Sequence, residues 1–113
     1  VLNTIPRAQT VVEMLAIIAH SSLFIGISMH GNIVARSYGV PHIFGPLPGV
    51  EKIQGAMQIM NMSPLQRIAS WGDLFFAMER VSKLSSLELI KSSDEAFSRA
   101  DKAAREMFSA LQV

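Results

Sequence analysis

The stretch between Met14 and Ala35 contains no Asp, Glu, Lys or Arg, and it constrains the fold more than any other feature of the chain. It is long enough to cross a bilayer, because a membrane-spanning helix needs about 20 predominantly apolar residues. Polar side chains interrupt it, however, among them His20, His30 and Asn32. A lipid-facing helix would have to bury each of these at a cost. We therefore expect no membrane span, and instead two shorter elements that are buried in protein.

The composition is typical of one folded domain. The chain has 113 residues, of which 50% are hydrophobic and 17% charged, with a formal net charge of +1. This length supports a single domain, and the apolar fraction excludes intrinsic disorder. A charge balance near zero provides no basic surface for nucleic acid. The absence of cysteine excludes disulfides and thiolate metal sites and favours a reducing compartment. We expect a cytoplasmic chain that was excised from something longer, because it starts at Val1 without a signal peptide.

Hydrophobic periodicity predicts an alternation of helices and strands. The expected elements are helices over 10–20, 33–38, 50–60 and 70–83, and strands over 23–27, 40–44 and 65–69. Continuous apolar runs such as 23–27 are typical of parallel strands covered on both faces. We therefore expect an α/β fold, a Rossmann-like layered fragment whose short parallel sheet of two or three strands is flanked by helices. It forms one domain over 1–113, or the C-terminal portion of one. Such a thin sheet exposes both edges, so self-association or a missing N-terminal half should cover them.

The C-terminal part of the chain carries two capping-box patterns. Residues 70–73 predict the start of a helix, and residues 92–95 predict the start of a C-terminal amphipathic helix over 93–112. The apolar face of that last helix comprises Phe97, Ala100, Ala104, Met107, Phe108 and Leu111. A second apolar group is expected to pack in the core rather than form a partner surface: Met57, Met60, Met62, Trp71, Phe75 and Phe76.

The turn after the first strand is the strongest candidate for chemistry. Ligands of open α/β folds bind at the carboxyl ends of strands, where a helix N-terminus favours anions. Gly31 would let a phosphate approach the backbone, and His30 could donate to phosphate oxygens or move a proton near neutral pH. The alternative is that His30 and Asn32 only cap the helix while Gly31 makes the turn. Spacing alone favours this alternative.

The remaining polar candidates carry weaker signals. His42 lies in the second strand, where it either points toward the same cleft or is buried by alternation. His20 ends the first helix, where a structural role is favoured. Arg36 is expected on a solvated helix face or paired with an acid. The three histidines have no metal-ligand spacing, so we expect no metal and no cofactor.

Residues 23–41, LFIGISMHGNIVARSYGVP, resemble the signature of the polysaccharide pyruvyl transferase family. The shared pattern is a hydrophobic strand, then His-Gly, a small helix and Gly-Val-Pro; the rest of the chain is similar only in element order. The resemblance implies two Rossmann-like halves, as in GT-B enzymes, with this chain as the last part of the C-terminal half. It also implies transfer of a pyruvyl group from phosphoenolpyruvate to a saccharide hydroxyl, forming a ketal during synthesis of an exopolysaccharide or cell-wall polymer. Any membrane association would arise through the substrate.

The same resemblance assigns roles to individual residues. His30 matches the family's histidine that contacts the donor, and Gly31 matches the glycine beside it. Ser28 stands where many members carry Arg, so it supplies a hydrogen bond but no charge. We expect His30 to be catalytic and the donor or phosphate to contact Ser28, His30, Gly31, Asn32 and His42. By itself this chain is expected to be inactive, because further acid, base and cationic groups are needed.

Two other functions remain open on the sequence. In a GT-B nucleotide-sugar glycosyltransferase, the same turn would hold a diphosphate. A non-catalytic module would instead self-associate through its sheet edges and methionine-rich surface. Both enzyme hypotheses predict that anion binding disappears in His30→Ala, whereas the module would form an oligomer that is indifferent to ligand and to that substitution.

Overall fold

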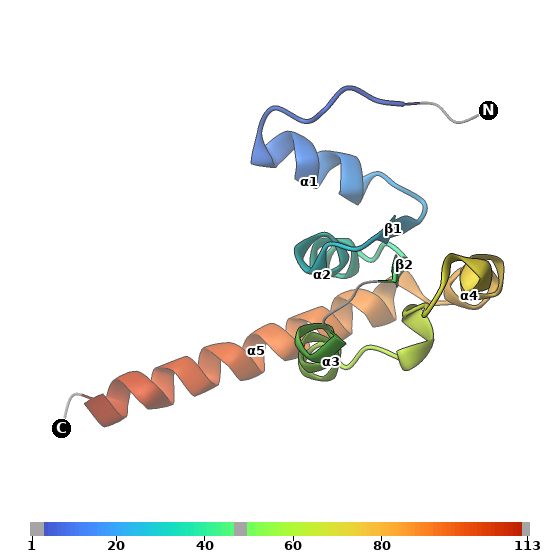
Figure 1. Cartoon of the computed structure of the whole chain (residues 1–113). Coiled ribbons are helices and arrows are strands. Elements are labelled where there is room, and N and C mark those ends of the chain that lie inside the picture. Colours follow the sequence, from blue (N-terminus) through green and yellow to red (C-terminus); the bar gives the residue numbers. More distant parts are fainter. Residues whose placement is uncertain (1–3, 47–49, 112–113) are drawn as a thin grey trace.

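The computed structural model describes residues 4–46 and 50–111, which form an α/β fold (Figure 1). The helices are α1 Val11–Ala19, α2 Met29–Ser37, α3 Val50–Ile59, α4 Leu74–Val81 and α5 Ser86–Leu111, with short 3-10 turns η1 Pro64–Gln66 and η2 Trp71–Asp73. The strands are β1 Phe24–Gly26 and β2 His42–Phe44. The two strands pair in parallel, with Ile25 opposite Ile43. This architecture confirms the expected α/β class with a short parallel sheet.

The segment expected to form a third strand makes only one bridge to the sheet. Arg67 pairs with Phe44 in a parallel bridge, and the Ile68 amide donates to the Phe44 carbonyl at 3.1 Å. The preceding residues are the 3-10 turn η1 rather than extended chain. Pro64 suits the first position of such a turn because its fixed φ is helical and it has no N–H to pair. The extended segment is therefore too short to continue the ladder.

Helix α2 begins earlier than the sequence suggested. Its N-cap is Ser28, whose Oγ accepts a hydrogen bond from the Gly31 amide at 3.1 Å. A serine in this position satisfies one of the free amides of the first turn, so the expected turn over 28–32 is instead the start of the helix. The helix stops where expected, because Gly39 adopts a φ of +71°.

The core is divided between the two faces of the sheet. Phe44 and Ile43 alternate in direction along β2, so each anchors a different buried cluster. One cluster comprises Phe44, Met57, Met60, Met62 and Ala96, and the other Ile43, Ile68, Ala77 and Val81. A third group joins α1 to α2 through Ile18, Ala35 and Val40. The core positions expected for the three methionines are confirmed.

The aromatic residues around α4 do not join this core. Trp71, Phe75 and Phe76 are 54%, 81% and 70% exposed, which corrects the expectation of core packing. Helix α4 packs Ala77 and Val81 against the sheet. Phe75 and Phe76 directly precede Ala77, so they lie on other faces of the helix. The capping box expected over 70–73 also differs, because the Ser70 side chain caps no backbone amide and η2 precedes the helix.

Helix α5 starts at Ser86, well before the expected boundary at 93, and its second half leaves the body of the molecule (Figure 1). The predicted N-cap Ser92 lies inside the helix, where its Oγ donates to the Met60 carbonyl at 2.7 Å. Leu89 and Ala96 are the residues that face the core. The apolar face expected to pack is exposed at Phe97, Met107, Phe108 and Leu111.

The long segment without charge is divided among α1, β1 and α2, as expected from its polar interruptions. Within residues 4–46 and 50–111, no helix is long and apolar enough to cross a membrane.

Candidate functional site

His30 lies in the first turn of α2, directly after the carboxyl end of β1. Its side chain is exposed, and its ring makes no hydrogen bond to any residue that the structure describes. The first amides of a helix lack intrahelical acceptors and carry the positive end of the dipole. Ser28 occupies one of them, that of Gly31. This end of α2 thus offers an open imidazole beside backbone donors.

Close packing around two glycines, Gly31 and Gly45, defines the carboxyl edge of the sheet. Gly31 is buried, and a Cβ in its place would lie 2.6 Å from Cζ of Phe24. At the end of β2, a Cβ on Gly45 would lie 2.9 Å from Cη2 of Trp71 and 3.1 Å from Cγ2 of Ile27. The half-exposed Trp71 indole therefore lies at the carboxyl edge of the sheet. Trp71 was expected in the core, although its position shortly after the segment that bridges to β2 at Arg67 could have indicated this edge.

Asn32 points away from the open end of α2. It is fully buried, and its Nδ2 donates to the carbonyls of Gly26 at 3.1 Å and Ser28 at 2.8 Å. Its Oδ1 lies 2.9 Å from Nδ1 of His42. The amide therefore fastens the end of β1 and the start of α2 to β2.

His42 is fully buried, with a partner on each ring nitrogen. Nε2 of Gln66 lies 3.0 Å from its Nε2, and an amide nitrogen can only donate. The ring thus accepts at Nε2 and donates from Nδ1 to Asn32. Burial, and then the positive charge of Arg36, lower the pKa of His42 to about 4. The imidazole is therefore neutral at physiological pH.

Arg36 extends the same buried network, which corrects its expected place on a solvated face or beside an acid. It is 5% exposed and donates to Gln66 Oε1 at 3.2 Å, Ser92 Oγ at 2.9 Å and the Asn61 carbonyl at 3.3 Å. Burial lowers its pKa from the ordinary value. Sequence reasoning missed Gln66 altogether, because an isolated Gln after a proline carries no local signal.

The structure thus separates the expected site residues into two groups. Ser28, His30 and Gly31 lie together at the N-terminus of α2. Asn32 and His42 lie beneath them, bonded to each other and closed off from solvent. A ligand at His30 would touch the first group, while the second group holds that end of the helix in place.

Comparison with known proteins supplies one match. No curated protein and no solved structure matches the chain. A family model does match its N-terminal part, over a stretch that ends at Phe44, the last residue of β2, and so takes in the whole β1–α2–β2 unit around His30. Residues 1–44 match the model of the polysaccharide pyruvyl transferase family.

Proposed function

We propose that this chain carries the donor side of a transferase that moves a pyruvyl group from phosphoenolpyruvate to a saccharide, in the synthesis of an exopolysaccharide or cell-wall polymer. The observation that carries the proposal is the open His30 in the first turn of α2, inside the stretch that matches the family. The match covers less than half of the chain, so substrate and reaction are part of the proposal.

The open end of α2 suits an anionic donor. Phosphoenolpyruvate presents a phosphate and a carboxylate, and both favour backbone amides at a helix N-terminus. The hydroxyl of Ser28 and the imidazole of His30 are the side-chain donors there. Neither carries a fixed charge, so the proposal requires a cation from another part of the enzyme. The exposed face of Trp71 at the same edge offers an apolar surface for the donor or the sugar.

The proposed reaction consumes one phosphoenolpyruvate and two hydroxyl groups of a saccharide. His30 gives a proton to the methylene carbon, and one hydroxyl oxygen bonds to C2. The bond from C2 to the phosphate oxygen then breaks, phosphate leaves, and the second hydroxyl oxygen bonds to C2. One hydroxyl proton restores His30 and the other leaves with phosphate. The products are a pyruvyl ketal and inorganic phosphate.

A titration of the chain with phosphoenolpyruvate, followed by phosphorus NMR, tests the proposal. We expect saturable binding that disappears in His30→Ala. The matched control is His20→Ala, because His20 is also exposed but sits at the far end of α1. This variant should bind like the parent chain. Preference for nucleoside diphosphates would indicate a glycosyltransferase, and absence of binding to either ligand would contradict a donor site in this chain.

A further inference from the structure

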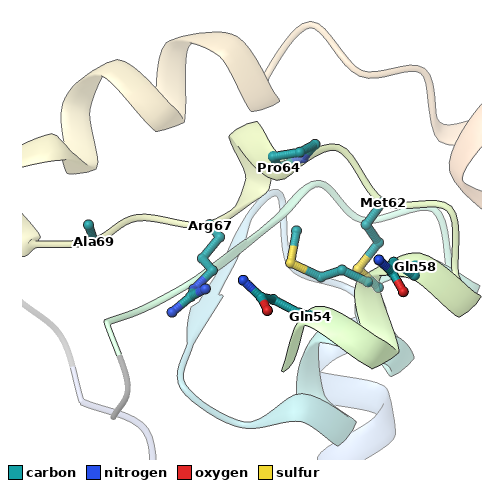
Figure 2. Close-up of a pocket in the computed structure, with 7 residues that line it drawn as sticks. Gln54, Gln58, Met62, Pro64, Arg67 and Ala69 are labelled. Atoms are coloured by element: carbon teal, nitrogen blue, oxygen red, sulfur yellow. The ribbon is translucent and has the colours of Figure 1, made fainter. Parts of the chain in front are cut away.

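A cavity lies away from His30, between α3 and the segment that follows it (Figure 2). Its volume is about 610 Å³, and the residues that line it are Gln54, Met57, Gln58, Met62, Pro64, Arg67 and Ala69. None of residues 28–32 is among them. The cavity therefore belongs to a different part of the molecule from the proposed donor site.

Arg67 is the charged residue in the described lining of this cavity, and its guanidinium makes no hydrogen bond or ion pair with any residue that the structure describes. Its Nε is buried without a hydrogen bond, and within residues 4–46 and 50–111 no carboxylate pairs with it. The Nε of Arg36 is also buried without a hydrogen bond, but the terminal nitrogens of Arg36 donate to three acceptors. A partly desolvated guanidinium without an acceptor is costly. An oxyanion is the ligand that a guanidinium fork binds best.

The other lining residues fit the remainder of a small organic molecule. Gln54 and Gln58 stand one turn apart on α3, so both amides can reach the same cavity. In Figure 2 the amide of Gln54 points toward the guanidinium of Arg67. The buried thioethers of Met57 and Met62 supply an apolar wall, and methionine adapts its shape to varied ligands.

We propose that this cavity binds a small organic oxyanion, whose charged group pairs with Arg67 while its apolar body packs on Met57 and Met62. The amide of Gln54 donates to a neighbouring oxygen of the ligand. The proposal goes beyond the proposed function and stands without it, because no residue is shared between the two sites.

The test uses two anions and a neutral analogue that share a phenyl ring: phenylacetate, phenyl phosphate and benzyl alcohol. The methyl signals of Met57 and Met62 in isotopically labelled protein report binding by NMR. We expect saturable shifts with at least one anion and none with the alcohol. The anion that binds with the higher affinity shows whether the site prefers a carboxylate or a phosphate.

Four variants test whether Arg67 is the residue that binds the anion. Arg67→Met should weaken anion binding by at least about tenfold, because a charge-assisted pair is lost. Arg67→Lys keeps the charge without the fork and should weaken binding less. Arg105→Met changes an exposed arginine on the distal part of α5 and should bind like the parent chain. His30→Ala should also leave this site unchanged, so failure of either proposal can be recognised independently.

Three results would overturn the proposal. One is the absence of saturable shifts with both anions. Another is equal binding of benzyl alcohol and the anions, which would show an unspecific apolar groove. The third is anion binding that is unaffected in Arg67→Met.

Discussion

His30, in the first turn of α2, and His42, in β2, differ in burial and in hydrogen bonding. His42 has a partner on each nitrogen, is fully buried and has a pKa lowered to about 4. His30 is exposed, and its ring bonds to nothing that the structure describes. The first is a neutral part of the framework, and the second is available to a ligand. The comparison teaches that burial and partners, rather than residue type, separate a structural histidine from a reactive one.

The strongest way to break this contrast is to remove the amide that holds His42. Asn32→Ala leaves Nδ1 of His42 without its acceptor and removes one of the two hydrogen bonds that each of the carbonyls of Gly26 and Ser28 accepts. Because buried groups without partners are costly, we expect the free energy of unfolding to fall by about 2–4 kcal/mol. Chemical denaturation followed by circular dichroism measures the loss. A change below about 0.5 kcal/mol would show that the network does not stabilise the fold.

Acidification tests the same network without a change of sequence. His42 has a pKa of about 4 in the folded chain against an ordinary value of 6.5, so between these values the unfolded chain binds a proton that the folded chain does not. The contribution of His42 is therefore fully present above pH 6.5 and is lost as the pH falls toward 4, by up to about 3 kcal/mol. Denaturation at several pH values measures the slope.

His42→Gln is the control for this slope, because the amide can still donate to Asn32 but does not titrate. The difference in slope between the parent chain and the variant isolates the histidine. Equal slopes in the two proteins would mean that His42 is not the group responsible.

Gly31 and Gly55 differ in how much space surrounds them, so alanine substitutions compare a packed helix position with an open one. A Cβ on Gly31 would lie 2.6 Å from Phe24, whereas a Cβ on Gly55 in α3 would meet nothing within 4 Å. We expect Gly31→Ala to destabilise the fold by about 1–3 kcal/mol through overpacking. Gly55→Ala should stabilise it by about 0.5–1 kcal/mol, since alanine favours a helix over glycine. Thermal unfolding of both variants would show opposite shifts, and shifts of the same sign would contradict the packing described here.

The smallest effect is expected at the other histidine. His30→Ala removes an exposed side chain whose ring makes no hydrogen bond to a described residue. The free energy of unfolding should therefore change by no more than about 0.5 kcal/mol. Phosphoenolpyruvate binding should nevertheless disappear. A large loss of stability in this variant would assign His30 to the framework and remove the contrast with His42.

Local patterns predicted the β1–α2–β2 unit well. The apolar run at Ile25 and the helix end at Gly39 both follow from signals within a few residues. The His-Gly pattern also indicated the family that residues 1–44 match. The start of α2 was misjudged because a serine N-cap and a turn have the same local composition.

The placement of the polar residues could not be predicted in this way. Gln66 meets His42 across 24 residues of chain, and Ser92 meets Arg36 across 56. Such partners become visible only when distant segments fold together. For the same reason the capping-box pattern at residues 92–95 suggested a helix start, although Ser92 lies inside α5 and binds the Met60 carbonyl.

The sequence by itself therefore determined the alternation of helices and short strands, the position of His30 near the first strand's end and the resemblance to a family, because these depend on neighbouring residues. Only the tertiary structure decided that Asn32, Arg36 and His42 are buried together and that Phe75 and Phe76 are exposed. Burial depends on which elements cover a side chain, and those elements lie far away in the sequence. The physical role of each polar residue was thus set by its packing rather than by its type.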